Sequence, residues 1–290
     1  MKIKADAQCM QCHLDRNMEL ARKLGDEEQA TVFFRALLKL MLEAPEDMSS
    51  PGYAPCTAQL LHEIYGLELD RYKEEKEASN AFVLERMDAI RASVESAADP
   101  VKAGLQHAIL GNYIDFSALR GQVSFEMLDD MLRSAHDIAI DPEAFASLQA
   151  DLKKAKRLLY ITDNAGEIGF DRIFAQQLQK AYPQLQIAFL VRGGPAMNDA
   201  MLEDALAVGV EFPIIENGNC VPGTQLDILS PEAKAALENA DVIISKGQGN
   251  VETLYGCGYN VYYAFLIKCE RFIRLFGKEK LTPMLLKERQ

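Results

Sequence analysis

The stretch TDNAGEIGFD contains an acid and an amide side by side, Asp163 and Asn164, between an apolar run and a helical pattern. A second acid in a similar position, Asp199, ends the stretch RGGPAMND. Hard divalent cations take carboxylate and carbonyl oxygens as ligands. We therefore predict Asp163, Asn164 and Asp199 as the ligands of a divalent metal, and Mn, Co, Ni or Mg would each accept this oxygen set.

A third loop, in the stretch SKGQGN, offers a cation and backbone amides. The ammonium of Lys246 is suited to a phosphate, and Gly247 lets backbone N–H groups approach an anion. Arg192 and Asn250 are predicted as further phosphate contacts, while Glu167 either orients a metal-bound water or caps the helix that follows. The metal would polarise a phosphoryl oxygen and acidify a bound water. These residues predict hydrolysis of a phosphate monoester by a metal-activated water.

Each of these loops also has a purely structural interpretation. Asp163-Asn164 before a helical pattern can be an N-cap, and Asn198-Asp199 could cap a helix in the same way. The positions of the loops favour a catalytic role over a capping role, because all three loops follow apolar runs of the sequence that predict strands. In open α/β sheets, ligands bind outside the carboxyl ends of the strands, so we expect the three loops to converge on one site.

The sequence pattern changes near residue 155, which indicates what positions the loops. The first 150 residues predict helices, including those at 71–98, 100–110, 124–139 and 142–155. Later, short apolar runs predict strands at 157–162, 187–192, 211–215, 241–245 and 261–267. Helical patterns between them lie at 167–181, 198–207 and 231–239. This alternation predicts an α/β fold with a mainly parallel sheet and helices on both faces. We expect an α-helical subdomain over 1–150 and a metal- and phosphate-binding domain over 151–290, as two folding units or as one helical cap packed on its sheet.

The bulk composition argues against several partners. The chain has 290 residues and a formal net charge of −12. An acidic surface repels phosphate backbones, so we expect no nucleic-acid partner. No apolar run approaches the roughly 20 residues of a membrane span, and the N-terminus lacks the apolar region of a signal peptide. We expect a cytoplasmic protein with no membrane partner, whose six cysteines stay reduced or bind metal. The oligomeric state is left open.

Two other kinds of site are disfavoured by particular positions. Haloacid-dehalogenase-type phosphatases carry a second Asp two residues after the nucleophilic Asp, whereas Ala165 stands two residues after Asp163. A dinucleotide-binding site needs GxGxxG after the first strand, and Gly247-Gln248-Gly249 lacks the third glycine. A metal-activated water that attacks a small phosphorylated metabolite fits the residues better than either.

The chain resembles the damage-control phosphatase family, formerly the domain-of-unknown-function 89 family, and most of all its cysteine-bearing archaeal and bacterial branch. The resemblance lies in six stretches spread over nearly the whole chain: CMQC (9–12), GNYIDF (111–116), TDNAGEIGFD (162–171), RGGPAMND (192–199), SKGQGNVETL (245–254) and IKCE (267–270).

The resemblance implies an α-helical N-terminal part and a Rossmann-like αβα sandwich. It also implies a divalent-metal phosphatase that removes harmful or misplaced phosphometabolites, with the metal at Asp163, Asn164 and Asp199. Asn112 and Asp115, in GNYIDF, would line the same cleft from the helical side. From the residues alone, GNYIDF is a turn that enters an amphipathic segment.

The cysteines allow several interpretations. Cys9 and Cys12 form a CxxC pair followed by His13, which matches the CxxCH of c-type haem attachment, but that attachment normally follows export. A redox pair or half of a zinc site remain. The resemblance makes Cys269 the preferred third ligand, with His13 or Cys56 as a fourth. We predict a second metal or a thiol cluster at Cys9, Cys12 and Cys269.

Two alternatives to a phosphatase remain open. Carboxyl methyl transfer from S-adenosylmethionine is also ascribed to relatives, but the sequence has no glycine-rich first loop with an acidic residue ending the second strand. The other alternative is a non-enzymatic protein that binds a metal or a phosphometabolite in the same pocket. Metal-stimulated turnover of an aryl phosphate separates an enzyme from a sensor, and S-adenosylmethionine binding identifies a methyltransferase.

Overall fold

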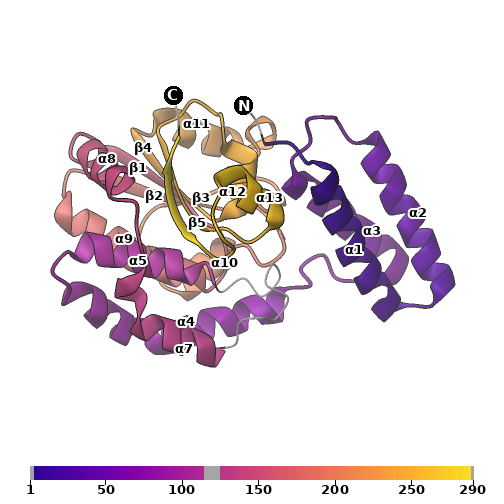
Figure 1. The fold of residues 1–290 in the computed structure, drawn as a ribbon, viewed down its shortest axis with the longest axis horizontal. Coiled ribbons are helices and arrows are strands. Elements are labelled where there is room, and N and C mark those ends of the chain that lie inside the picture. Colours follow the sequence, from indigo (N-terminus) through magenta and orange to yellow (C-terminus); the bar gives the residue numbers. More distant parts are fainter. Residues whose placement is uncertain (1–2, 114–124, 289–290) are drawn as a thin grey trace.

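The computed structural model describes residues 3–113 and 125–288, so the predicted site residue Asp115 lies outside the described residues. An N-terminal bundle of helices stands to one side of the central sheet (Figure 1). Its helices are α1 (Ala7–Leu24), α2 (Glu27–Glu43) and α3 (Ala54–Tyr65). Their common core contains Ala21, Ala30, Phe33, Leu37 and Leu61. The bundle therefore has an apolar core of its own.

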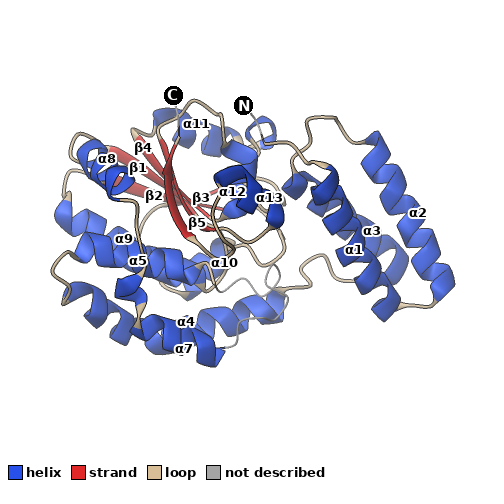
Figure 2. Ribbon diagram, in the orientation of Figure 1, coloured by secondary structure: helices blue, strands red, loops and turns tan. Residues whose placement is uncertain are grey.

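The sheet has six strands within the described ranges, in the order β3-β2-β1-β4-β5-β6 (Figure 2). Their bounds are β1 (Arg157–Ile161), β2 (Gln186–Val191), β3 (Ile214–Glu216), β4 (Val242–Lys246), β5 (Val261–Leu266) and β6 (Pro283–Lys287). All neighbours pair in parallel except β5 and β6. The chain runs outward from β1 to β2 and β3, then returns to place β4 on the other side of β1. The order of the strands therefore reverses between β1 and β4. Open α/β sheets bind ligands at such a switch point, outside the carboxyl ends of the strands.

Helices cover both faces of the sheet. On one face, α5 (Pro100–Gly111) and α8 (Pro142–Leu152) pack with α9 (Glu167–Ala181) and α10 (Leu202–Ala207) over a core that includes Leu105, Leu148, Phe174 and Phe189. On the other face lie α11 (Pro231–Asn239), α12 (Gln248–Leu254) and α13 (Glu270–Phe276). Helices α4 (Lys73–Glu95) and α7 (Phe125–Arg133) pack outside α5 and α9. The result is an αβα sandwich with the N-terminal bundle beside it.

The predicted fold class is confirmed, and the observed strands differ from the predicted ones mainly at their ends. The strand expected at 211–215 begins only at Ile214, because Pro213 precedes it and proline cannot donate to a sheet. The helix expected at 198–207 begins at Leu202, since the preceding residues form β-bridges. The antiparallel edge strand β6 was not predicted. The division at residue 150 stays a prediction, although α5 from the helical half shares its core with the sheet.

No helix among the described residues is both long enough and apolar enough to cross a membrane.

Candidate metal and phosphate site

The predicted metal-binding loops lie side by side at the carboxyl edge of the sheet. Strand β1 ends at Ile161, whose register partners are Leu190 in β2 and Ser245 in β4. Beyond the strands, Asn164 and Asp199 form an isolated antiparallel bridge. The backbone N–H of Ala200 donates to the Asp163 carbonyl oxygen at 2.7 Å, and that of Ala165 donates to the Asn198 carbonyl oxygen at 2.9 Å. The backbone itself therefore holds the two loops together.

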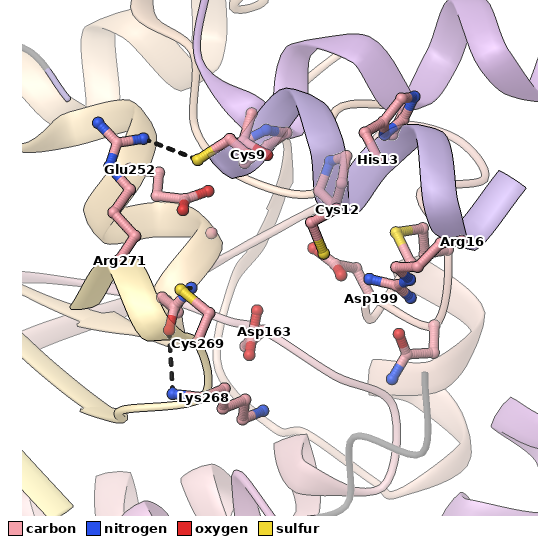
Figure 3. Close-up of a pocket in the computed structure, with 18 of the residues that line it drawn as sticks. Cys9, Cys12, His13, Arg16, Asp163, Asp199, Glu252, Lys268, Cys269 and Arg271 are labelled. Carbon is pink, nitrogen blue, oxygen red and sulfur yellow. Dashed lines mark hydrogen bonds between the residues drawn. The ribbon is translucent and has the colours of Figure 1, made fainter. Parts of the chain in front are cut away.

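These loops form one wall of a pocket of about 530 Å³. Asp163, Asn164 and Asp199 all line it, although each residue is at most 7% exposed. Figure 3 shows Asp163 and Asp199 around the pocket together with Cys12 and Arg16 of α1. The predicted metal ligands therefore share one cavity.

Hydrogen bonds orient each predicted ligand. Oδ2 of Asp163 accepts from Nδ2 of Asn112 and from Nδ2 of Asn164, both at 2.8 Å. Oδ1 of Asn164 accepts from Asn198 at 2.8 Å, and Oδ2 of Asp199 accepts from Nε of Arg192 at 2.6 Å. Two carboxylates and one amide, held by such contacts, make an oxygen donor set that fits a hard cation. Their role as metal ligands stays a prediction.

Gly247 explains how Asp163 can occupy its position. A side chain at residue 247 would place its Cβ 2.0 Å from the Asp163 Cγ, far inside van der Waals contact. Gly247 also has a φ of +77°, a region that side-chain-bearing residues rarely adopt. Its N–H donates to the Ala264 carbonyl oxygen in the sheet rather than facing the pocket. Gly247 does not line the pocket, so the predicted approach of an anion to the backbone at this glycine is corrected; the glycine makes room for Asp163.

Lys246 does not line the pocket, so its predicted contact with phosphate is also corrected. Its ammonium is fully buried beneath the pocket and donates to the Ala108 carbonyl oxygen at 2.7 Å, to Oε1 of Glu167 at 2.6 Å and to Oδ1 of Asp171 at 2.8 Å. Burial opposes the charged form, but the charges of Asp171 and Glu167 outweigh it, so the pKa of Lys246 is raised. Burial also raises the pKa of Asp171, despite the nearby ammonium. With three acceptors on its three N–H groups, Lys246 is a positioning residue.

Glu167 connects the buried ammonium of Lys246 to the loop that carries Asp163 and Asn164. Its carboxylate is fully buried and does not line the pocket. Its Oε2 accepts from Nδ2 of Asn164 at 2.7 Å and from Nδ2 of Asn112 at 2.9 Å. The same oxygen accepts from the Asn164 backbone N–H at 3.4 Å, but Asn164 precedes the N-cap residue Gly166, so this contact orders the loop rather than capping α9. The carboxylate lies behind Asn164, so its predicted role in orienting a metal-bound water would have to act through Asn164.

Arg192, Asn250 and Asn112 form the remainder of this supporting layer. Arg192 is fully buried, and besides Asp199 it donates to the Thr162 carbonyl oxygen and to Oδ1 of Asn250, both at 3.2 Å. Asn250 donates to the same carbonyl oxygen at 2.9 Å. None of these three residues lines the pocket, so their predicted contacts with phosphate are corrected. Asn112 therefore does not line the cleft as expected, but it contacts Asp163 from the helical side.

Several pocket cations were not predicted. Lys268 lies two residues after β5, and Figure 3 shows its side chain extending beside Asp163. The strand-end rule that found the other loops would have found it, had it been applied to the last predicted strand. Arg16 comes four residues after Cys12 on α1, so helical spacing places both on one face. Arg271 and Lys280 also line the pocket. The pocket lining thus has four cationic side chains beside four carboxylates, those of Asp163, Asp199, Glu252 and Glu270.

The three predicted cysteine ligands line this pocket but do not form a metal site. Within residues 3–113 and 125–288, no three His, Cys, Asp or Glu side chains are grouped so that they could hold a metal ion. The sulfur of Cys9 accepts from Arg271 at 3.1 Å, and that of Cys269 accepts from Gln248 at 3.3 Å. Figure 3 shows Cys9 and Cys12 on α1, across the pocket from Cys269. The expected cluster is therefore not formed, because its members belong to opposite walls.

Glu252 is an unusual acid in the same pocket wall. It is 8% exposed and lies on α12, one turn after Gln248. Burial raises the pKa of its carboxyl to about 7, and the positive charge of Arg271 only partly opposes that effect. Sequence reasoning gave no role to Glu252, since a glutamate within a short helical segment has no distinguishing pattern.

The fold and the site together define an α/β sandwich whose switch point carries a buried set of carboxylate and amide oxygens. The sequence matches the damage-control phosphatase ARMT1-like domain over residues 5–282, and the chain belongs to this family.

Known relatives match over nearly their full lengths. A damage-control phosphatase of Archaeoglobus fulgidus is 29% identical and covers 95% of this chain and 96% of its own. One from Pyrococcus horikoshii is 29% identical, with 94% of each chain covered. An uncharacterized protein of Methanocaldococcus jannaschii is 29% identical over 98% of this chain and 96% of its own. The crystal structure of a DUF89 family protein from P. horikoshii superposes with a TM-score of 0.82 at 25% identity, covering 99% of each chain.

Proposed function

We propose that this protein is a divalent-metal-dependent phosphatase that hydrolyses a small phosphorylated metabolite. The observation that carries the proposal is the convergence of Asp163, Asn164 and Asp199, from two loops bridged to each other, on one pocket at the switch point. Two carboxylates and an amide suit a hard cation, and a pocket of about 530 Å³ suits a small metabolite. Membership of the damage-control phosphatase family supports the same class of reaction.

The residues around the pocket divide the chemical work. A divalent cation held by Asp163, Asn164 and Asp199 would polarise the phosphoryl group and lower the pKa of a bound water. Lys268 places a positive charge on the pocket wall, where it neutralises charge that develops on the phosphoryl oxygens. Arg192 orients Asp199 from behind, so the ligand is held before substrate arrives.

Hydrolysis of p-nitrophenyl phosphate after chelation and re-addition of Mg, Mn, Co or Ni tests the proposal. Asp163→Ala and Asp199→Ala each remove an anionic ligand, so both should lose nearly all metal-dependent turnover and bind Mn²⁺ weakly by calorimetry. Asp88→Ala serves as the matched control, because Asp88 is an exposed acid on α4 that does not line this pocket. Near wild-type turnover of either ligand variant at limiting metal would show that the ligand assignment is wrong. Metal binding without turnover of any phosphate ester would favour the non-enzymatic alternative.

A further inference from the structure

A second pocket of about 390 Å³ adjoins the metal pocket. It lies between α1, the beginning of α3, the segment that leads into α4 and the loop before Asp199. The residues that line both pockets are His13, Arg16, Ala54 and Met197. A molecule whose phosphate lies beside Asp163 can therefore extend past these residues into the second pocket. The cleft as a whole is larger than a phosphoryl group requires.

Backbone strain marks the junction of the two pockets. Met197 has a φ of +56°. Among the described non-glycine residues, only Met197 and Leu281 have a positive φ. Such a conformation costs on the order of 1–3 kcal/mol and persists where the surrounding structure enforces it, commonly at ligand sites. Two residues later, Asp199 is fixed by its bridge to Asn164. The residue at the junction is therefore directly connected to the metal loop.

The charges around the second pocket favour an anion. Arg16 lies at the junction, and Figure 3 shows its guanidinium near Asp199. Arg71 lines the far side, where it donates to the Tyr72 hydroxyl at 3.1 Å and lies over the Tyr72 ring at 4.9 Å. Burial, together with the charge of Arg16, lowers the pKa of His13 to about 4, so this histidine is neutral near pH 7. The pocket thus has two guanidinium groups against one carboxylate, that of Glu75.

We propose that the second pocket binds the organic part of the substrate, and that Arg16 and Arg71 select phosphorylated molecules whose far end carries a carboxylate. The inference rests on the proposed phosphatase function and names a substrate class for the same site. A guanidinium presents N–H donors in the fork geometry that a carboxylate accepts, which distinguishes such a group from a neutral hydroxyl. The expected substrates are therefore phosphorylated sugar acids or hydroxy acids.

A matched pair of substrates tests this selection. 6-Phosphogluconate and glucitol 6-phosphate have the same carbon chain and phosphate ester, but only the former ends in a carboxylate. Charge-assisted contacts should favour 6-phosphogluconate by about 10- to 100-fold in kcat/KM. Arg71→Gln should lower this ratio at least about threefold, mainly through KM, because Arg16 remains. Arg22→Gln, an exposed arginine on α1 that lines neither pocket, should keep the wild-type ratio.

The outcomes separate this inference from the proposed function. A ratio near one in the wild-type protein, or a ratio that Arg71→Gln leaves unchanged, overturns the inference even if aryl phosphate is hydrolysed with metal. If no ester is hydrolysed, the phosphatase proposal fails, and calorimetry with the same two compounds still tests the pocket. Tighter binding of 6-phosphogluconate that is lost in Arg71→Gln then supports the anion subsite, and equal binding refutes it.

Discussion

Replacing Lys246 with methionine should destabilise the whole protein, rather than remove a contact with phosphate. The ammonium lies 2.6 Å from Glu167 and 2.8 Å from Asp171, and all three side chains are fully buried. Methionine keeps most of the aliphatic stem but deletes the charge, so two carboxylates remain in the core without their cation. Removing one partner of a buried ion pair costs about 3–5 kcal/mol. We expect the free energy of unfolding at pH 7 to fall by about this amount.

Urea unfolding followed by circular dichroism measures the loss, with Lys39→Met as the control because Lys39 is an exposed lysine on α2. The loss should shrink as the pH falls from about 8 to about 5. The pKa of Asp171 is already raised in the folded protein, so its protonated form favours folding at low pH and that contribution is lost as the pH rises. Without the ammonium, Asp171 protonates more readily, and the uncompensated charge disappears.

Two results would refute this reasoning about Lys246. A loss of stability below about 1 kcal/mol at pH 7 would mean that the buried ion pairs do not support the sheet edge. Unchanged stability together with a kcat/KM reduced about 100-fold would instead indicate the direct phosphate contact that the sequence predicts. Metal affinity measured on the same variant shows whether loss of the lysine also displaces the metal loop through Glu167.

Three further variants test other contacts of the site. Gly247→Ala should weaken metal binding at least about tenfold by calorimetry, because the new Cβ would lie 2.0 Å from the Asp163 Cγ. Gly258→Ala is the control for backbone strain, because Gly258 also has a positive φ, +81°, but its Cβ would meet nothing within 4 Å. Glu252→Gln should gain stability over wild type by about 3 kcal/mol as the pH rises from about 4 to about 8, because burial raises the carboxyl pKa from 4.5 to about 7; a pH-independent difference in urea unfolding would contradict this. Cys12→Ser should leave the metal content unchanged by elemental analysis, and a lost equivalent of zinc or iron would restore the predicted cysteine site.

Sequence patterns predicted the part of the site that depends on topology. Runs of apolar residues located five of the strands. The rule that ligands bind at the carboxyl ends of parallel strands then placed Asp163, Asn164 and Asp199 at one sheet edge, where they do lie together. Strand β6 was missed because it is a short antiparallel edge that begins at a proline, and neither feature gives a strong apolar run.

The direction of each side chain at a strand end was beyond what the sequence could predict. Lys246 ends β4 and Lys268 follows the end of β5 by two residues, yet the first points into the layer beneath α9 and the second lines the pocket. A lysine after a buried strand normally faces solvent or a ligand. The burial of Lys246 depends instead on Glu167 and Asp171, which lie one turn apart on α9. That acceptor pair becomes visible only once α9 is placed against β4. Arg192 was misassigned for the same reason, since its partner Asp199 lies across a loop.

The separate core of the N-terminal bundle has a consequence for how such a protein can diverge. Helix α1 supplies one wall of the pocket, whereas the predicted metal ligands Asp163, Asn164 and Asp199 belong to loops that follow strands of the sheet. The bundle core is made of bundle residues, and Asp6, just before α1, meets α13 through ion pairs with Arg271 and Arg274. Substitutions on the pocket-facing side of α1 can therefore accumulate while the core of the sandwich stays the same, whereas Ser50–Tyr53 packs on α12 and is tied to it. A lineage of such proteins can inherit one reaction centre and exchange its substrate range, and chimeras that swap α1 between relatives reproduce that history in the laboratory.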